Sequence, residues 1–405
     1  MDTSETPQSG AWDGRGDGPA AQLRGTGAQL MYESTYPMPA PRIRPRRWPL
    51  FLPIGLVVGI AAVWSGVWFF ASANAETMLA GWREREAKAG RIYSCEKQSV
   101  GGYPFRIEVQ CAAPLAELRS TEPPVALKAK GLVAAVQVYD PKLVISELQG
   151  PLTVGEPGKP PTFLANWTLA ESSVRGTPQA PERVSIVFDG PVVHRIGENG
   201  NTNLFKAQHA ELHGRIKSGS VTDHPVIDLA LLLAAASASD LHPAAKTPID
   251  ADIVAVLRGL KDFAPKPWPE RFRELQAENG AIEITKARIQ QEDIIAVSSG
   301  SLGLSPRGKL DGRLQVTIVQ LDKLLKKLDL ERLLSEGQAG SALGALDRIM
   351  PGLGDIARQN APNLIASIGQ RTILEGKPAV TLPLRFVDGA AFLGPIPVGR
   401  VPALY

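Results

Sequence analysis

One long apolar segment near the N-terminus constrains this sequence more than any other feature. No charged residue lies between Arg47 and Glu76, and the stretch Pro49 to Phe70 is apolar throughout except for Ser65. Because an α-helix rises 1.5 Å per residue, this stretch is long enough to cross the ~30 Å hydrocarbon core of a bilayer. The sequence therefore predicts a single transmembrane helix over residues 48–73.

The charges that flank this segment predict its orientation. Its N-terminal side carries a cluster of arginines: Arg42, Arg44, Arg46 and Arg47. The positive-inside rule then keeps the N-terminus in the cytoplasm and exports everything after about Ala75. A signal peptide cleaved after Ala75 is the alternative, because the small residues from Ala71 onward resemble a cleavage site. Both interpretations export the same domain.

The segments on either side of the span have different characters. Most of residues 1–47 is rich in Gly, Pro, Ser, Thr and Gln without apolar periodicity, which predicts a disordered cytoplasmic tail. In residues 74–91, Met78, Leu79 and Trp82 are spaced among charged residues as in an amphipathic helix. We expect this second segment to be a stalk that leads to the exported domain.

The only two cysteines, Cys95 and Cys111, follow the apolar segment. Disulfides persist in exported domains, and the sequence around Gly101-Gly102-Tyr103-Pro104 predicts a hairpin that brings the two cysteines opposite each other. A redox or metal pair is the alternative, but the C-x-x-C spacing typical of such sites is absent. We therefore expect a Cys95–Cys111 disulfide.

The first part of the exported region, from residue 92 to about 233, has the pattern of β-structure. Short runs of alternating apolar and polar residues are separated by turn signals such as Gly150-Pro151 and Gly190-Pro191, which is typical of an antiparallel meander. The runs that predict strands are Val125–Lys130, Leu132–Val138, Lys142–Leu148, Phe163–Ala170 and Val184–Phe188.

Helical spacing appears in the second part of this region. Apolar residues at i, i+3, i+4 and i+7 predict a helix over Pro248–Lys261, and further helices are expected over Pro269–Ala277 and Leu321–Gln359. Strands are predicted at Ala281–Gln290, Ile294–Leu304, Leu310–Gln320 and Ala379–Phe386. This order indicates an α+β domain over residues 92–405, built of antiparallel sheet with packed helices, with 92–262 and 268–405 as candidate halves.

Composition and motifs argue against several functions. Aromatic residues make up 6% of the chain and the formal net charge is +3, which gives neither a stacking surface nor a phosphate-binding field for nucleic acid. The sequence lacks the common nucleotide, nucleophile-elbow, zinc-protease and calcium-loop motifs. We therefore expect the protein to be non-enzymatic and to bind no cofactor. An enzyme with an unrecognised site is a further alternative, ranked below lipid binding and below a scaffold role.

One cluster resembles a metal site. In a strand, His209, Glu211 and His213 share one face, and a metal ion bound there would need a fourth ligand such as His224. Acidic turns at Asp311-Gly312 and Asp388-Gly389 are a second candidate for chemistry. We favour the simpler interpretations, namely a solvated strand face with Ala210 and Leu212 packed beneath it, and two tight turns.

Aliphatic residues are more abundant than one thin sheet buries. The simpler interpretation, which we favour for these residues, is an ordinary helix-on-sheet core; the functional alternative is a groove for acyl chains, because ligand sites are mostly apolar. The candidate lining residues are Leu229, Leu231, Leu233, Leu257, Leu324 and Leu328.

Several segments resemble a family of alphaproteobacterial single-pass envelope proteins of unknown function. They are Gly102–Arg106, Gly131–Pro141, Leu302–Gly312, Leu382–Gly389 and Leu393–Pro397. The turn Ser305–Gly312 also resembles, more distantly, the AsmA-like envelope proteins. That resemblance implies curved antiparallel sheets and lipid handling between membranes, and it implies no catalytic residues.

Together these observations predict a non-enzymatic protein of the bacterial inner membrane, with its N-terminus in the cytoplasm and its C-terminal domain in the periplasm. Its expected role is to bind or pass lipid in envelope maintenance. The alternative is a scaffold that docks a periplasmic protein through a sheet edge or through the helical region 321–360.

Overall fold

The computed structural model describes residues 48–177, 180–198, 200–240, 243–264, 266–327, 369–394 and 396–404. The predicted tail 1–47, the candidate lining residue Leu328 and most of the predicted helical region 321–360 lie outside these ranges. The chain divides into two compact units, Met1–Leu56 and Val57–Tyr405. The sheets described below all belong to the second unit.

Helix α1 (Trp48–Lys88) forms where the sequence is apolar and free of charge. Its part from Phe51 onward is long and apolar enough to cross a membrane, and only 6% of its most apolar window is buried. The predicted span and the predicted stalk are thus one continuous helix. This helix ends at Lys88, a few residues before the expected end, because Gly90 adopts a positive φ of 77° and turns the chain into the first strand.

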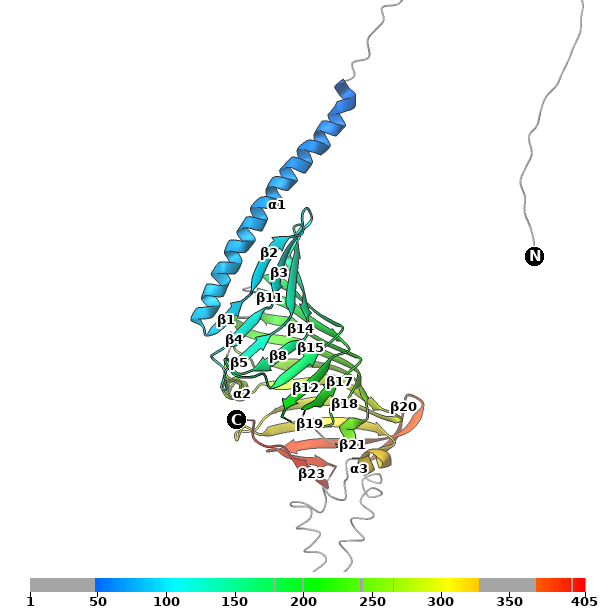
Figure 1. Ribbon diagram of the computed structural model, residues 1–405. Helices are drawn as coiled ribbons and strands as arrows, with labels where there is room; N and C mark the ends of the chain where they lie inside the picture. Colours follow the sequence, from blue (N-terminus) through cyan, green and yellow to red (C-terminus); the bar gives the residue numbers. More distant parts are fainter. Residues whose placement is uncertain are drawn as a thin grey trace, which may run out of the picture. The chain divides into compact units, whose positions relative to one another are not determined.

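The region after α1 is mostly antiparallel β-structure in two sheets (Figure 1). The small sheet has seven strands, in the order β1 (Arg91–Ser94), β4 (Leu115–Leu118), β5 (Val125–Lys128), β8 (Leu152–Gly155), β9 (Phe163–Asn166), β12 (Val192–Gly197) and β13 (Gly200–Lys206).

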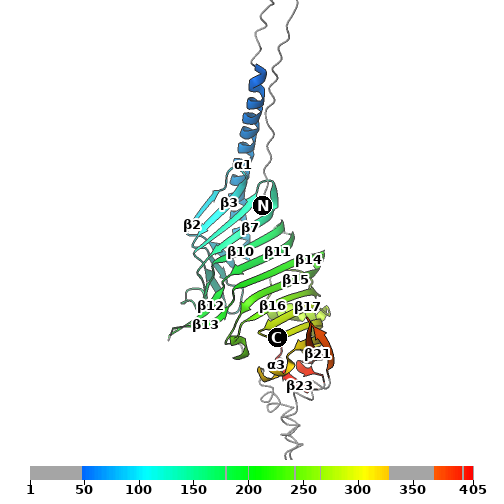
Figure 2. The same ribbon diagram turned by 90° about the vertical axis from the view of Figure 1, so that its right-hand side faces the viewer.

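The large sheet has sixteen strands. In order they are β2 (Lys97–Gly101), β3 (Arg106–Ala112), β6 (Gly131–Gln137), β7 (Asp140–Gln149), β10 (Leu169–Thr177), β11 (Ala180–Asp189), β14 (His209–Ser220), β15 (Asp223–Ala236), β16 (Ile249–Arg258), β17 (Ala281–Gln291), β18 (Ile294–Leu304), β19 (Leu310–Val319), β21 (Lys377–Val387), β22 (Ala390–Leu393) and β23 (Ile396–Arg400), with β20 (Gln370–Leu374) paired to β21. Figure 2 shows most of these strands lying side by side.

The chain passes between the two sheets two strands at a time, so the predicted meander was wrong. Strands β2 and β3 belong to the large sheet, β4 and β5 to the small sheet, and the alternation continues until β14, after which every strand is in the large sheet. Gly150-Pro151 and Gly190-Pro191 are therefore corners between sheets, and the predicted strand Phe163–Ala170 breaks at such a corner into β9 and β10. Small buried residues such as Ala129, Ala170 and Ala207 mark the line along which the sheets meet.

The predicted helix over Pro248–Lys261 was also wrong, because most of it is strand β16. This strand lies between β15 and β17, and residues on both of its faces, such as Ala255 and Val256, are buried. Apolar residues on both faces remove the period of two that marks a half-exposed strand, and the remaining spacing imitates a helix. Because β16 pairs directly with β17, one sheet crosses the boundary between the candidate halves, whose separation stays a prediction.

The helices that do form are few. Helix α2 (Trp268–Ala277) confirms the prediction over Pro269–Ala277, and α3 (Leu321–Lys327) is the described part of the predicted region that begins at Leu321. A short 3₁₀ helix covers Pro243–Lys246. Among the described residues the fold is therefore mostly β, with less helix than the expected α+β arrangement.

The Cys95–Cys111 disulfide is present, with a Cα–Cα distance of 5.4 Å. Its position differs from the expected one, because Cys111 in β3 lies opposite Gln98 of β2. Cys95 precedes β2 and follows β1, where the chain leaves the small sheet for the large one. The disulfide therefore ties the junction of the two sheets to β3.

Candidate functional site: an apolar sheet face

One face of the large sheet is apolar across most of its strands. Directly paired residues share a face, so the pairing register defines a row that runs from strand to strand. From β3 to β16 the row at the middle of this face is Val109, Ala134, Ser146, Ser172, Ile186, Leu212, Leu231 and Ile253. Its only polar members are two serines, whose hydroxyls are 2.7 Å apart and hydrogen-bonded to each other. We call this surface the apolar face.

The structure brings four of the candidate lining residues together on this face. Leu229, Leu231 and Leu233 alternate along β15, and Leu257 of β16 pairs with Ile227 on the same side. The residues of β15 thus share one side of the sheet, and their role in lining a lipid surface stays a prediction. Leu257 was placed on a helix, yet as a strand residue it still lies on the apolar face.

Part of this face is only partly covered by the described residues. The exposed fractions of Leu212 in β14 and of Ile282 and Ile289 in β17 are 47%, 41% and 39%. Leu229, Leu231 and Leu233 lie among them and are only half-buried. Large side chains of a closed core are usually almost fully buried, so β14 to β17 present an apolar surface that the described residues leave partly open.

Further along the same sheet the apolar face is covered. Helix α3 packs there, and Ile318, Leu321, Leu325 and Leu382 form a cluster in which no residue is more than 4% exposed. Leu324 packs against this cluster. Leu324 is thus partly buried beside this cluster, and its predicted role in lining a lipid surface stays a prediction.

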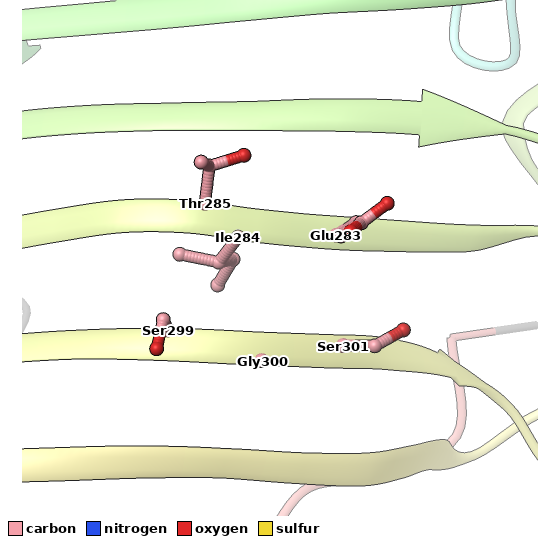
Figure 3. Close-up of a pocket in the computed structure, with 6 residues that line it drawn as sticks. All are labelled: Glu283, Ile284, Thr285, Ser299, Gly300 and Ser301. Atoms are coloured by element: carbon pink, nitrogen blue, oxygen red, sulfur yellow. The ribbon is translucent and has the colours of Figure 1, made fainter.

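A pocket of about 470 Å³ lies where β17 and β18 pair irregularly (Figure 3). Gly300 lies opposite Ile284 of the apolar face, and its φ of 144° suits glycine. A Cβ at Gly300 would lie 2.2 Å from the carbonyl oxygen of Arg313, so only glycine fits there. The one ionisable lining residue, Glu283, pairs with Arg258 at 3.2 Å. The lining residues are Glu283, Ile284, Thr285, Ser299, Gly300 and Ser301.

The opposite face of the large sheet, which we call the polar face, carries the histidine cluster, in which Glu211 pairs with Val187 of β11 and Leu232 of β15. His209 Nε2 is 2.6 Å from Glu211 Oε1, and His213 Nε2 is 2.8 Å from Glu211 Oε2. His209 Nδ1 also lies 2.5 Å from Asp189 Oδ1 of β11. The hydrogen bonds to Glu211 and then to Asp189 raise the pKa of His209, and those from the two histidines lower the pKa of Glu211. The cluster is thus a chain of mutually paired groups.

This cluster has the shared strand face that the sequence predicted, but two details differ. Leu212 is on the opposite face as expected, yet it is exposed and not packed. His224 lies six residues before Ala230, the partner of His213, so it is about 20 Å away along the strand and bonds to Asp223 instead. Within the described ranges no group of three or more His, Cys, Asp or Glu residues is arranged to hold a metal ion.

The acidic turns have structural partners. Asp388 has a φ of 49°, and its carboxylate accepts a hydrogen bond from the hydroxyl of buried Ser305 at 2.8 Å, which lowers the pKa of Asp388. Arg307 pairs with the same carboxylate at 2.6 Å. Asp311 accepts the backbone N–H of Asp388. These contacts join the turn after β18 to the turn after β21.

Sequence reasoning missed the exposed residues Ile282 and Ile289 as members of the apolar face. Both alternate with polar neighbours in β17, which was itself predicted. The missing information was the partner strand, because only pairing with β16 shows that they share a side with Leu257 and Ala251.

Comparison with known proteins identifies relatives but no activity. The family described as "Uncharacterized protein conserved in bacteria (DUF2125)" matches residues 68–402. No curated protein matches the chain.

Proposed function

The chain belongs to this family of uncharacterised bacterial proteins, and from that premise we propose that it is a non-enzymatic, membrane-anchored envelope protein that binds the acyl chains of lipids. The binding surface is the uncovered part of the apolar face, on β14 to β17. The protein is held by one span in the inner membrane, with its N-terminus in the cytoplasm and its sheets in the periplasm.

The observation that carries this proposal is the partial exposure of the apolar face. Leu212, Leu231 and Ile282 belong to one continuous side of one sheet, and the strip from β14 to β17 is about 14 Å wide at the usual strand spacing. Exposed apolar surface of this extent is unfavourable in water, so it is kept where a ligand or a membrane covers it. An acyl chain is a flexible apolar ligand that needs no specific polar partner, which suits a surface of leucine and isoleucine.

The location is supported by two further features. Helix α1 is long and apolar enough to cross a membrane. The Cys95–Cys111 disulfide indicates an extracytoplasmic domain, because thiols in the cytoplasm stay reduced. The distant resemblance to AsmA-like envelope proteins agrees with a role in lipid handling and stays a prediction.

Neighbouring residues of β15 provide the test, because they point to opposite faces. Leu231 lies on the apolar face, whereas Leu232 is on the polar face and is 40% exposed. We would express the full chain in cells that incorporate a photoreactive fatty acid, irradiate them, and count lipid adducts on peptides from β14 to β17. Adducts on peptides from α1 report the span and are counted separately.

We expect Leu231→Asp to lower the adduct yield on β14 to β17 at least about tenfold, since a charge in an acyl-binding surface costs well over 1.4 kcal/mol. Leu232→Asp is the matched control and should leave the yield unchanged. Equal yields in the two variants, both folded by circular dichroism, would contradict the proposal. The scaffold alternative stays a prediction, because most of residues 321–360 lies outside the described ranges.

A further inference from the structure

The hairpin between β2 and β3 contacts the helix that is expected to span the membrane. The indole Nε1 of Trp64 donates a hydrogen bond to the carbonyl oxygen of Pro104 at 2.8 Å, and that of Trp68 donates to Arg106 at 2.7 Å. The hydroxyls of Ser65 and Tyr103 are also 2.8 Å apart. These bonds attach the hairpin to two successive turns of α1.

Aromatic contacts reinforce this attachment. The ring of Tyr103 lies edge-on to Trp68, with centroids 5.4 Å apart, and stacks on Phe69 at 6.1 Å. Phe105 lies 6.3 Å from Trp64. Such aromatic pairs stabilise a contact beyond the area that they bury, so the hairpin is held at a defined height along the helix.

The same hairpin exposes large aromatic side chains. Tyr103 and Phe105 are 55% and 62% exposed despite their contacts with α1. Tyr139, in the turn between β6 and β7, is 67% exposed, and the neighbouring Val138 N–H donates a hydrogen bond to the carbonyl oxygen of Phe105. We call Tyr103, Phe105 and Tyr139 the aromatic tip.

The length of the span decides what surrounds the aromatic tip. If the tip were outside the bilayer, Trp64 and everything after it would be outside too, because they lie at the same height. The apolar stretch left to cross the membrane would be Pro49–Val63, about 22 Å long at 1.5 Å per residue and shorter than the ~30 Å hydrocarbon core. Extending the stretch to Phe70 restores the required length. Trp64 then lies inside the membrane, in the leaflet on the exported side, and the tip lies at the same depth.

We propose that the aromatic tip is immersed in the outer leaflet of the membrane that α1 crosses. The occupant of this exposed surface is the lipid bilayer itself. Tyrosine and tryptophan favour the boundary between headgroups and acyl chains, and no charged residue lies between Gly101 and Phe105. The nearest cation on the hairpin, Arg106, is exposed and pairs with Glu108 at 2.8 Å.

Immersion of the tip puts the first strands of the apolar face next to lipid. Ile107 and Val109 of β3 lie on that face and follow Phe105 directly. Lipid could then pass from the leaflet onto the sheet without crossing water. This last step rests on the proposed function, whereas immersion of the tip does not, so the two can fail separately.

The experiment uses the full chain in nanodiscs of phosphatidylethanolamine and phosphatidylglycerol. The two natural cysteines are bonded to each other, so Phe105→Cys provides a single thiol for an environment-sensitive fluorophore. Lys159→Cys, in the exposed turn between β8 and β9, is the control. Emission is measured with nitroxide-bearing lipids and, separately, with iodide in the buffer.

We expect nitroxide lipids to quench the label at position 105 several-fold more than the label at 159, and iodide to show the opposite order. Tyr139→Cys, on a separate turn, should behave like Phe105→Cys and serves if that variant does not fold. Iodide quenching at 105 and 139 equal to that at 159 would overturn the proposal. Lipid quenching at 105 together with no adducts on β14 to β17 would uphold immersion and contradict acyl binding.

Discussion

Two regions of the apolar face have the same composition and different surroundings. On β18, β19 and β21 the face is covered by α3, and Ile318 and Leu382 are almost completely buried. On β14 to β17 the face continues in register, yet Leu212, Ile282 and Ile289 are substantially exposed. Both regions are aliphatic sides of one antiparallel sheet, so strand sequence alone does not decide their burial.

The difference shows what a cover contributes. Helix α3 covers the cluster over β18 to β21, because Leu321 and Leu325 are one turn apart and both belong to it. Within the described ranges, α3 closes the face at this region. The open region is the part that a lipid would cover, and the predictions below compare the two, from the largest expected effect to the smallest.

Removing a side chain beneath α3 should cost the most stability. Leu382→Ala empties a site with 0% exposure, and we expect a loss of about 4 kcal/mol in the free energy of unfolding. Chemical unfolding of the full chain in detergent measures this loss. A change below about 1 kcal/mol would mean that the covered region is not a packed core.

The first strands of the sheet contact no buried cluster among the described residues, and they depend more on the disulfide. Replacing both cysteines, Cys95→Ser with Cys111→Ser, should cost about 3 kcal/mol, because the crosslink closes a loop with a sequence separation of 16. The same loss should follow when the unaltered chain is unfolded in reductant. If reductant destabilised the double variant as well, the effect would not come from this disulfide.

The open region should tolerate truncation. Leu212→Ala removes a side chain that is already about half exposed, so the loss should be about 1 kcal/mol or less. The same unfolding measurement as for Leu382→Ala applies. Comparable losses at the two positions would remove the distinction between a covered and an open region.

The polar face behind the open region should respond weakly to pH. Because the pKa of His209 is raised in the folded protein, its protonation stabilises the fold. This stabilisation is complete below pH 6.5, the ordinary value, and is lost as pH rises through the pKa of the folded state. Because the pKa of Glu211 is lowered in the folded protein, its ionised carboxylate also stabilises the fold. This stabilisation is complete above pH 4.5 and is lost as pH falls through the pKa of the folded state. The free energy of unfolding of the wild type should therefore exceed that of Glu211→Gln by the largest amount between pH 4.5 and pH 6.5.

We expect this advantage to be only about 0.3 kcal/mol, because water screens groups that are this exposed. Thermal unfolding of both proteins across this pH range measures it. An advantage that grew steadily above the raised pKa of His209 would contradict the pairing of these groups.

The parts of the fold that could be predicted from the sequence are those with a strong local signal. Helix α1 follows from an uninterrupted apolar run, and β18 was predicted with its exact bounds because Ser305–Lys309 forms a turn after it. The leucines of β15 were recognised from their density. In each case neighbours along the chain carry the information.

The parts that were missed depend on distant partners. The two-sheet arrangement depends on which strands pair, and the corner at Ala207 carries no glycine or proline to mark it. Strand β16 lost its alternation because both of its faces are partly covered. The attachment of Tyr103 to Trp68 joins two elements that no local pattern connects. Such features are tertiary, so single-sequence patterns do not reveal them.

The most direct test of the account is to map lipid adducts along the apolar face of the unaltered full chain after irradiation with a photoreactive fatty acid. We expect adducts on peptides that contain Leu212, Leu231 and Ile282, and none on peptides that contain Ile318 and Leu382, which α3 covers. Adducts spread evenly over both regions, or confined to α1, would contradict the claim that the open region of this face binds acyl chains.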